Sequence, residues 1–434
     1  MPPKMTILAY QALIRFGMGR RGAAPLPTDP HAWLAAQIRA PDPAAFPPQL
    51  PTTADGLTIW REKLKLKLSP ELDFVRPLLR EDMRAQLNQA LETDAAFRER
   101  LVWFWANHFT VSTKAGVTAA LVGPYVREAI RPNVTAPFLD LLLAVMRHPA
   151  MLMYLDNNAS VGPGSPVGQR QHRGLNENLA RECLELHTIG VDGGYTQKDV
   201  TELASLLTGW SVDAGAAQPG FVFRLEAHEP GPKMLLGRRF PPGEAGGLMA
   251  LEYLANHPST HRHLAQKLVR HFVADDPPPE DVRTIEGVLR DTGGDLQAAS
   301  LALIALPGAW APLTKLRGPA DYVLAALRAL DLPEPERPPP EAAMALLGQP
   351  LWTAPLPNGF PDDTASWAAP EAVMRRVDWA YALSGRAATA DPLAVGEAAL
   401  GPLLRGTTRA AMAQAGARRD ALTLMLTSAE FQRR

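Results

Sequence analysis

The sequence predicts a mainly α-helical protein, a large multi-helix globular array that carries one small β-hairpin insertion. Three observations favour this class. Apolar residues recur at three- and four-residue steps over long stretches. Leu, Ala, Met and Arg dominate these stretches, whereas β-branched residues are few. Strand-like alternation is confined to one short region, and the 434 residues are enough for a large hydrophobic core.

The helical pattern is clearest in four stretches, interrupted by proline-rich connectors. The helical stretches are 5–17, 90–111, 135–155 and 261–274. The connectors are 41–53, 276–281 and 332–341. Such prolines favour extended surface segments over helix interiors. We therefore expect one large helical unit over residues 1–434, with sub-boundaries at the three connectors.

The hairpin is expected at residues 221–237. Phe221, Phe223 and Leu225 alternate with polar or smaller residues, and the following HEPGPK sequence has the composition of a turn. A second short apolar run completes the pattern. The insertion would be a small β appendage on a helical body.

Composition excludes several classes of function. The chain has 44 Lys and Arg against 45 Asp and Glu, and we find no basic cluster, so we expect no nucleic-acid partner. The single cysteine, Cys183, excludes an intramolecular disulfide and a cysteine-based zinc site. No apolar run approaches the roughly 20 residues of a membrane span. The N-terminus lacks a signal-peptide pattern, and as written we expect a soluble, cytoplasmic chain.

The densest group of chemically active residues lies in ARECLELHTIGVDGGYTQKD (180–199). A helix over 176–189 is expected to stop before Gly190, where a glycine would take a positive φ. A second helix is expected to start at Thr196, with Asp199 completing a near capping box. The motif is thus a helix, a short loop and a helix.

Helical geometry separates the acidic and basic side chains of this motif. Glu182 and Glu185 fall on one stripe, and His187 lies roughly opposite them. Their spacings to His187 are five and two residues, so one helix cannot direct them at a single ion. A calcium loop is disfavoured because Gly190 and Thr188 occupy positions of acidic ligands. Two interpretations stay open: a reaction centre completed by other elements, or a capped and ion-paired corner.

Other histidines are candidates of the same kind. His108 extends the apolar stripe of Phe97, Leu101 and Phe104, where a hydrogen-bonded core histidine is the commoner case. His228 stands at the expected hairpin turn. We find neither a phosphate-binding loop nor a nucleophile elbow.

Several long motifs in order give the chain a resemblance to a known family. They are RFGMG (15–19), WFWANHFTV (103–111), HPAMLMYLDN (148–157), NENLARECLELHTIGVDGGYTQKDVTELASLLTGW (176–210), HEPGPKMLLG (228–237), LGQPLWTAPLPNGFPD (347–362) and a terminal TSAEFQRR. The sequence resembles bacterial domain-of-unknown-function family 1800 over nearly its whole length. The resemblance implies one large, mainly helical unit and no established activity. Family members are often exported and neighbour a second uncharacterised secreted family, whereas this sequence lacks the signal.

The resemblance also directs attention to particular positions. The family pattern includes His108, Glu182, Glu185, His187, Asp199, Glu202, Trp210 and His228 as they stand here. It usually has aspartate where this chain has Glu229 and leucine where it has Cys183. One helix cannot direct the glutamates and His187 at a single ion, but side chains from separate elements that converge in space could form a shared site.

Our leading hypothesis is an enzyme with a polar, metal-dependent centre between the central helices and the hairpin. His108, His187 and His228 would be metal ligands or acid–base groups, with Glu182 or Glu185 as a base or ligand-orienting residue. Zinc, iron and copper all accept such donors, so hydrolytic and oxidative reactions on an unknown small molecule both remain open.

The rival hypothesis is a non-catalytic binding or scaffold protein. It would act with a partner protein through its loops, and exposed apolar surface near QPLWTAPLPNGFP (349–361) would favour it. A haem protein is a third alternative, without a C-x-x-C-H attachment motif.

Overall fold

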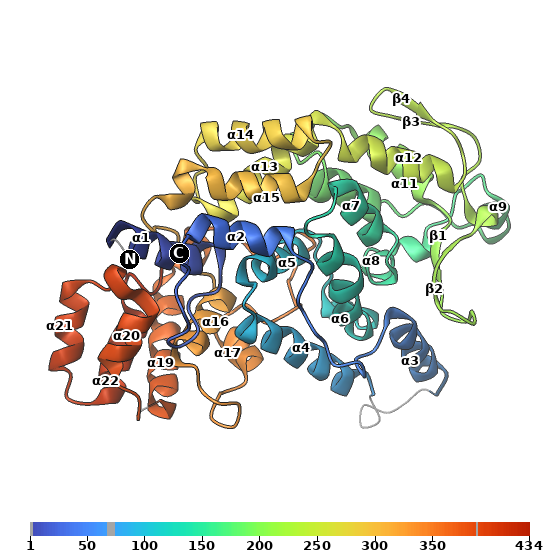
Figure 1. Cartoon of the computed structure of the whole chain (residues 1–434). Coiled ribbons are helices and arrows are strands. Elements are labelled where there is room, and N and C mark those ends of the chain that lie inside the picture. Colours follow the sequence, from blue (N-terminus) through green and yellow to red (C-terminus); the bar gives the residue numbers. More distant parts are fainter. Residues whose placement is uncertain (1–2, 67–73, 388) are drawn as a thin grey trace.

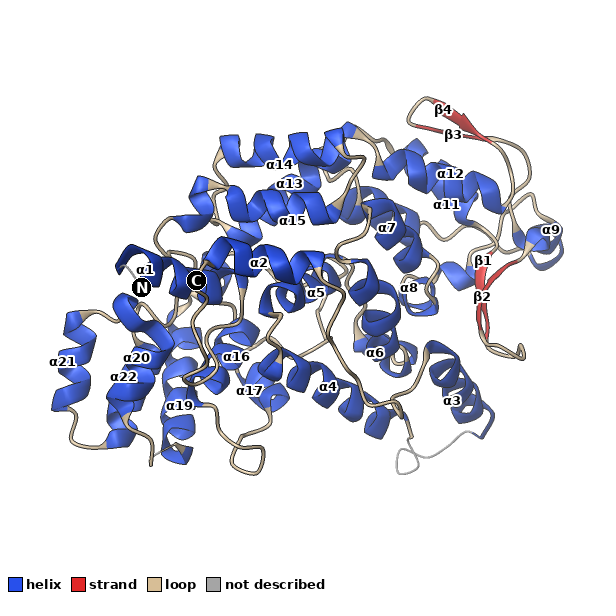
Figure 2. Cartoon of the chain, in the orientation of Figure 1, coloured by secondary structure: helices blue, strands red, loops and turns tan. Residues whose placement is uncertain are grey.

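The computed structural model describes residues 3–66, 74–387 and 389–434, and it confirms the predicted fold class. Helices make up most of the described chain, and the β-structure consists of two small antiparallel pairs (Figures 1 and 2). Helices α19–α22 gather at one end of the molecule, and the strands lie toward the opposite end (Figure 1). No helix of the described residues is long and apolar enough to cross a membrane.

The helices are joined by connections of very different length. In the first half they are α1 (Pro3–Gln11), α2 (Pro30–Arg39), α3 (Thr53–Leu66), α4 (Val75–Glu92), α5 (Ala96–His108), α6 (Val122–Tyr125), α7 (Phe138–Met146), α8 (Pro149–Tyr154), α9 (Pro166–Gln171), α10 (Asn178–Glu182) and α11 (Gln197–Leu207). In the second half they are α12 (Glu244–Ala255), α13 (Pro258–Phe272), α14 (Pro279–Asp291), α15 (Leu296–Ala305), α16 (Pro319–Leu330), α17 (Pro340–Leu346), α18 (Thr364–Trp367), α19 (Pro370–Arg386), α20 (Pro392–Leu400), α21 (Gly406–Gln414) and α22 (Arg418–Thr427).

Many prolines start helices in this chain. Proline occupies the first position of α2, α8, α13 and α16, among others, where its missing N–H costs no hydrogen bond. The three proline-rich connectors accordingly run into helix starts, at α3, α14 and α17. The predicted helix over 135–155 is two helices, α7 and α8, because the His148 side chain accepts the Ala150 N–H as a cap before Pro149.

The corner at residues 178–207 has the predicted start and stop signals. The Thr196 and Asp199 side chains form a complete capping box at the start of α11. Gly190 has φ +81°, in the region that only glycine adopts without strain. The preceding helix differs from expectation, because α10 continues into a single π-helical turn over Cys183–His187.

The β-structure is correctly placed, but its strand pairing differs from the predicted hairpin. Strand β1 (Trp210–Asp213) pairs with β2 (Gly220–Phe223), and β3 (Lys233–Leu235) pairs with β4 (Arg238–Phe240). The second pair turns through Leu236 and Gly237, both with positive φ, as a tight two-residue hairpin requires. The HEPGPK segment therefore connects two hairpins and is not itself the turn of one.

Two clusters of buried apolar side chains form the core. The larger includes residues of α5, α7, α11 and α13, and the smaller includes residues of α4, α16, α19 and α22. The N-terminal segment contributes to both, since Phe16 belongs to the larger cluster and Ile14 and Met18 belong to the smaller.

The N-terminal and C-terminal segments are in contact. The Tyr10 hydroxyl donates to the Glu397 carbonyl, and both ends lie on the same side in Figure 1.

Candidate functional site

Histidine side chains hydrogen-bond the last two carbonyl groups of the π-helical turn that carries His187. His108 Nε2 lies 3.2 Å from the His187 carbonyl oxygen, and His263 Nε2 lies 3.0 Å from that of Leu186. The Thr188 hydroxyl, just past the turn, donates to the carbonyl of Cys183, the first residue of the turn. His108 and His263 therefore donate from Nε2 and cap a helix end, which needs such donors when it is buried.

His108 and His187 are close together, as the sequence hypothesis requires, but both are buried among aromatic rings. Their ring centroids are 6.1 Å apart, and the Phe109 ring lies 5.0 Å from that of His187. Burial lowers the pKa of His187 to about 3 and that of His108 well below its usual value, with nearby Lys267 adding to both shifts. The two imidazoles are therefore neutral at physiological pH.

Glu182 and Glu185 lie on the opposite, half-exposed side of the same turn. The Tyr195 hydroxyl donates to Glu185 Oε2 over 3.1 Å. Partial burial and then the neighbouring Glu185 charge raise the pKa of Glu182. The sequence geometry, with the glutamates on one side and His187 on the other, thus matches the structure, and the carboxylates do not join the buried histidines.

His228 is engaged elsewhere. Its Nδ1 lies 2.8 Å from the Thr208 carbonyl oxygen, and its Nε2 accepts the Gly243 N–H over 2.8 Å. Both ring nitrogens are therefore used to hold backbone together, on either side of the strand segment. Within the part of the chain that the structure describes, no three His, Cys, Asp or Glu side chains are grouped so that they could hold a metal ion. The expected convergence of His108, His187 and His228 is not found there.

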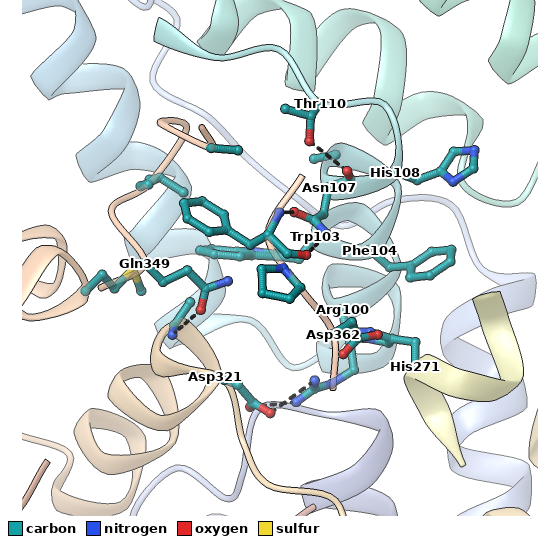
Figure 3. Close-up of a pocket in the computed structure, with 18 of the residues that line it drawn as sticks. Arg100, Trp103, Phe104, Asn107, His108, Thr110, His271, Asp321, Gln349 and Asp362 are labelled. Atoms are coloured by element: carbon teal, nitrogen blue, oxygen red, sulfur yellow. Dashed lines mark hydrogen bonds and ion pairs between the residues drawn. The ribbon is translucent and has the colours of Figure 1, made fainter. Parts of the chain in front are cut away.

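A cavity of about 380 Å³ lies where the two core clusters meet. Helices α5, α13 and α16, the segment 349–367 and Arg434 form its walls (Figure 3). Its aromatic residues are Trp103, Phe104, Trp352, Phe360 and Trp367. Its charged and polar residues include Gln86, Arg100, Asn107, His108, Thr110, Lys267, Arg270, His271, Asp321, Gln349, Asn358, Asp362, Asp363 and Arg434. Apolar walls with a few converging polar groups are typical of small-molecule sites.

One amide fixes the wall formed by the segment 349–367. The Asn107 side chain donates to the Phe360 carbonyl over 3.0 Å and accepts the Phe360 N–H over 2.8 Å. Gly359 passes so close that a Cβ there would lie 2.5 Å from the Asn107 carbonyl oxygen, and its φ is +78°. These contacts place Asp362, two residues after Phe360, against α13.

A network of buried ion pairs lies beside the cavity. Arg100 binds Asp321 over 2.8 Å (Figure 3), and Arg434 lies 3.0 Å from Asp321 and 3.1 Å from Asp362. Lys315 also lies 3.2 Å from Asp362. Burial alone would raise the pKa of both aspartates. Arg100, Arg317 and Arg434 hold the pKa of Asp321 well below the usual range, and His271, followed by Arg434 and Lys315, does the same for Asp362. Both carboxylates are therefore ionised.

His271 and Asp362 form a histidine–carboxylate pair at the cavity. His271 Nδ1 lies 2.7 Å from Asp362 Oδ2, and the two side chains lie beside each other in Figure 3. Burial lowers the pKa of His271 to about 4 in spite of the aspartate. The imidazole is therefore neutral, with its proton on Nδ1, and its buried Nε2 has no hydrogen-bond partner in the described residues. A lone pair at Nε2 can accept a proton.

Lys267 precedes His271 by one helical turn on α13 and also lines the cavity. Burial lowers its pKa to about 8, although the Asp362 charge acts in the opposite direction. Neither a hydrogen bond nor an ion pair joins its amine to any described residue. The Lys267 side chain is half-buried, so its ammonium group is only partly solvated and has no counter-ion in contact with it.

The sequence hypothesis did not include His271, Asp362, Lys267, Arg100, Asp321 or Arg434. One signal was present: His263, Lys267 and His271 repeat at four-residue intervals, so they share one face of α13 with buried leucines. The partners of that face lie up to 163 positions away, and no local pattern connects them.

The fold and the cavity define a mainly helical protein with a charged internal pocket. Comparison with known protein families identifies the family of this chain. The family model described as "Protein of unknown function (DUF1800)" matches residues 11–433, and the chain belongs to that family. No curated protein and no solved structure matched the chain.

Proposed function

We propose that this protein is an enzyme that hydrolyses a small organic molecule in the cavity, with His271 as the general base. The observation that carries the proposal is the His271–Asp362 pair, in which a 2.7 Å hydrogen bond fixes the Nδ1–H tautomer. That tautomer leaves the basic lone pair on Nε2. General-base catalysis requires a neutral imidazole held in this way.

The surrounding residues suit this role. Arg434 and Lys315 keep Asp362 ionised, so it accepts the Nδ1–H and stabilises the imidazolium that forms when Nε2 takes a proton from water. Asn107 holds the backbone of Phe360 and thereby positions Asp362. The aromatic walls limit access of bulk water, which strengthens electrostatic interactions within the cavity.

This proposal relocates the reaction centre that the sequence suggested. His108 lines the cavity and caps the His187 carbonyl, and His187 is a core residue outside the cavity lining. Glu182 and Glu185 face away from both. The hydrolytic alternative is retained, and the proposed step uses no metal. The scaffold hypothesis keeps one supporting observation, since Leu356 of the segment 349–361 has 58% of its surface exposed.

The first test is hydrolysis of a panel of p-nitrophenyl esters, phosphates and anilides by the wild-type protein, His271→Gln and His172→Gln. We expect turnover of at least one class and a fall of about 10²- to 10⁴-fold in kcat for His271→Gln. His172 is an exposed histidine and its variant should keep full activity.

The pH profile gives a second readout. Because His271 must be neutral to act as a base, the rate should rise through about pH 4 and stay level above about pH 5. Equal rates for the wild type and His271→Gln on every hydrolysed substrate would refute the proposal.

A further inference from the structure

Lys267 differs from the two buried arginines of the cavity, Arg100 and Arg434. Arg100 is paired with Asp321, and Arg434 is paired with Asp321 and Asp362. Lys267 is half-buried and makes no ion pair with any described residue of the cavity wall. The fourth lining cation, Arg270, is exposed to solvent.

The acidic residues of the cavity make no ion pair with Lys267, although the Asp362 charge acts on it from a distance. Asp362 Oδ2 accepts from His271, and its Oδ1 lies 3.1 Å from Arg434 and 3.2 Å from Lys315. Asp363 bonds to the Ser366 backbone and hydroxyl at the start of α18. The site therefore has capacity for one additional negative charge next to Lys267.

We propose that the cavity binds an organic monocarboxylate with a flat apolar body, its carboxylate against the Lys267 ammonium group. The inference rests on the same cavity as the proposed hydrolase and names its ligand class. One unpaired cation matches a single negative charge. The forked guanidinium groups that best bind phosphate are already engaged by Asp321 and Asp362.

The aromatic residues that line the cavity account for the flat apolar body. Trp103, Phe104, Trp352 and Phe360 border a volume of about 380 Å³, which fits a ligand of one or two rings. Exposed Arg270 adds positive potential at the cavity and would attract an anion. At neutral pH the Lys267 amine is mostly protonated, because its pKa of about 8 lies above the pH.

The test is calorimetric titration of the full chain at pH 7 with 2-naphthoate, its uncharged analogue 2-naphthamide, and inorganic phosphate. We expect 2-naphthoate to bind about tenfold or more tightly than 2-naphthamide, and phosphate alone to bind no better than the amide. In Lys267→Gln the preference for the carboxylate should disappear. Lys198→Gln, the same change at an exposed lysine on α11, should keep it.

A stability measurement separates ligand binding from a structural role of Lys267. Removing a half-buried charge that makes no ion pair should leave the melting temperature of the ligand-free protein unchanged or higher. A lysine that merely supports the fold would give a lower melting temperature on substitution.

The outcomes are distinguishable from failure of the proposed hydrolysis. Binding of 2-naphthoate should survive in His271→Gln, which removes the base but not the Lys267 charge. Absence of binding to the wild type, equal binding to Lys267→Gln, or tighter binding of phosphate would each overturn the carboxylate assignment. If 2-naphthoate binds but no ester, phosphate or anilide of the p-nitrophenyl panel is hydrolysed, the carboxylate assignment stands and only the proposed hydrolase is refuted.

Discussion

At the scale of single residues, the buried histidines are the most informative feature. Burial lowers the pKa of His148 and His187 to about 3 and that of His263 and His271 to about 4. Each hydrogen-bonds or packs as a neutral imidazole. Protonation in the folded state would leave a charge in a poorly solvated place.

These pKa values predict loss of stability in mild acid. The folded-state values lie below the unfolded value of about 6.5, so between about pH 6.5 and pH 4 the unfolded chain binds more protons. The free energy of unfolding should therefore fall as the pH is lowered through this window, by up to about 1.4 kcal/mol per pH unit for each histidine. Urea denaturation at a series of pH values measures this slope.

A matched pair of variants assigns the slope to burial. His148→Asn keeps a side-chain acceptor at the start of α8 and removes the titrating group, so its slope should be shallower. His172→Gln, at an exposed histidine, should leave the slope unchanged. A free energy of unfolding that stays constant from pH 7 to pH 4.5 would contradict the assignment.

Local sequence signals predicted much at this scale, but not the pairing of residues. The capping box of Thr196 and Asp199 and the positive φ of Gly190 follow from spacing and residue type, because both depend on neighbours in sequence. The pair of His271 and Asp362 spans 91 positions. No local rule could join them, so the sequence interpretation favoured the denser motif around His187.

At the scale of elements, the segment 349–367 depends on a close passage of backbone. Gly359 and Gly348 both have positive φ, but only Gly359 lies against another residue, Asn107.

The pairing of the β-strands also depends on contacts that are distant in sequence. The alternation at 221–223 was recognised, whereas its pairing with 210–213 and not with 233–235 depends on the fold around it.

Alanine substitution of the two glycines should separate strain from collision. Gly348→Ala should cost about 1 kcal/mol, because only the left-handed backbone conformation opposes it. Gly359→Ala should cost at least about 2 kcal/mol, because its Cβ would also meet the Asn107 carbonyl oxygen. Urea denaturation measures both, and equal losses would show that the passage is not tight.

At the scale of the whole molecule, buried ion pairs join the two core clusters. Arg100 lies on α5 beside the larger cluster, and Asp321 lies on α16 beside the smaller. Arg317 and Arg434 bind the same aspartate. A charged contact therefore lies between the two clusters.

Asp321→Asn should destabilise the entire chain. It leaves three arginines with reduced compensation, and breaking a buried pair in this way typically costs about 3–5 kcal/mol. Asp331→Asn is the control, because Asp331 is exposed and lies 3.9 Å from Arg21, so its loss should be within about 0.5 kcal/mol. Scanning calorimetry should give one lowered transition for Asp321→Asn, and an unchanged melting temperature would refute the central role of this contact.

The pocket beside Asp321 also has a consequence for synthesis of the chain on the ribosome. Its charged residues come from α5, α13, α16, the segment near Asp362 and Arg434, so they span more than three hundred positions. Arg100 and Asp321 emerge long before Arg434, and the helices between them can fold as they appear. The pocket itself closes only after Arg434 has left the exit tunnel. Until Arg434 is available, Asp321 and Asp362 lack one of their cationic partners, and the pocket stays incomplete.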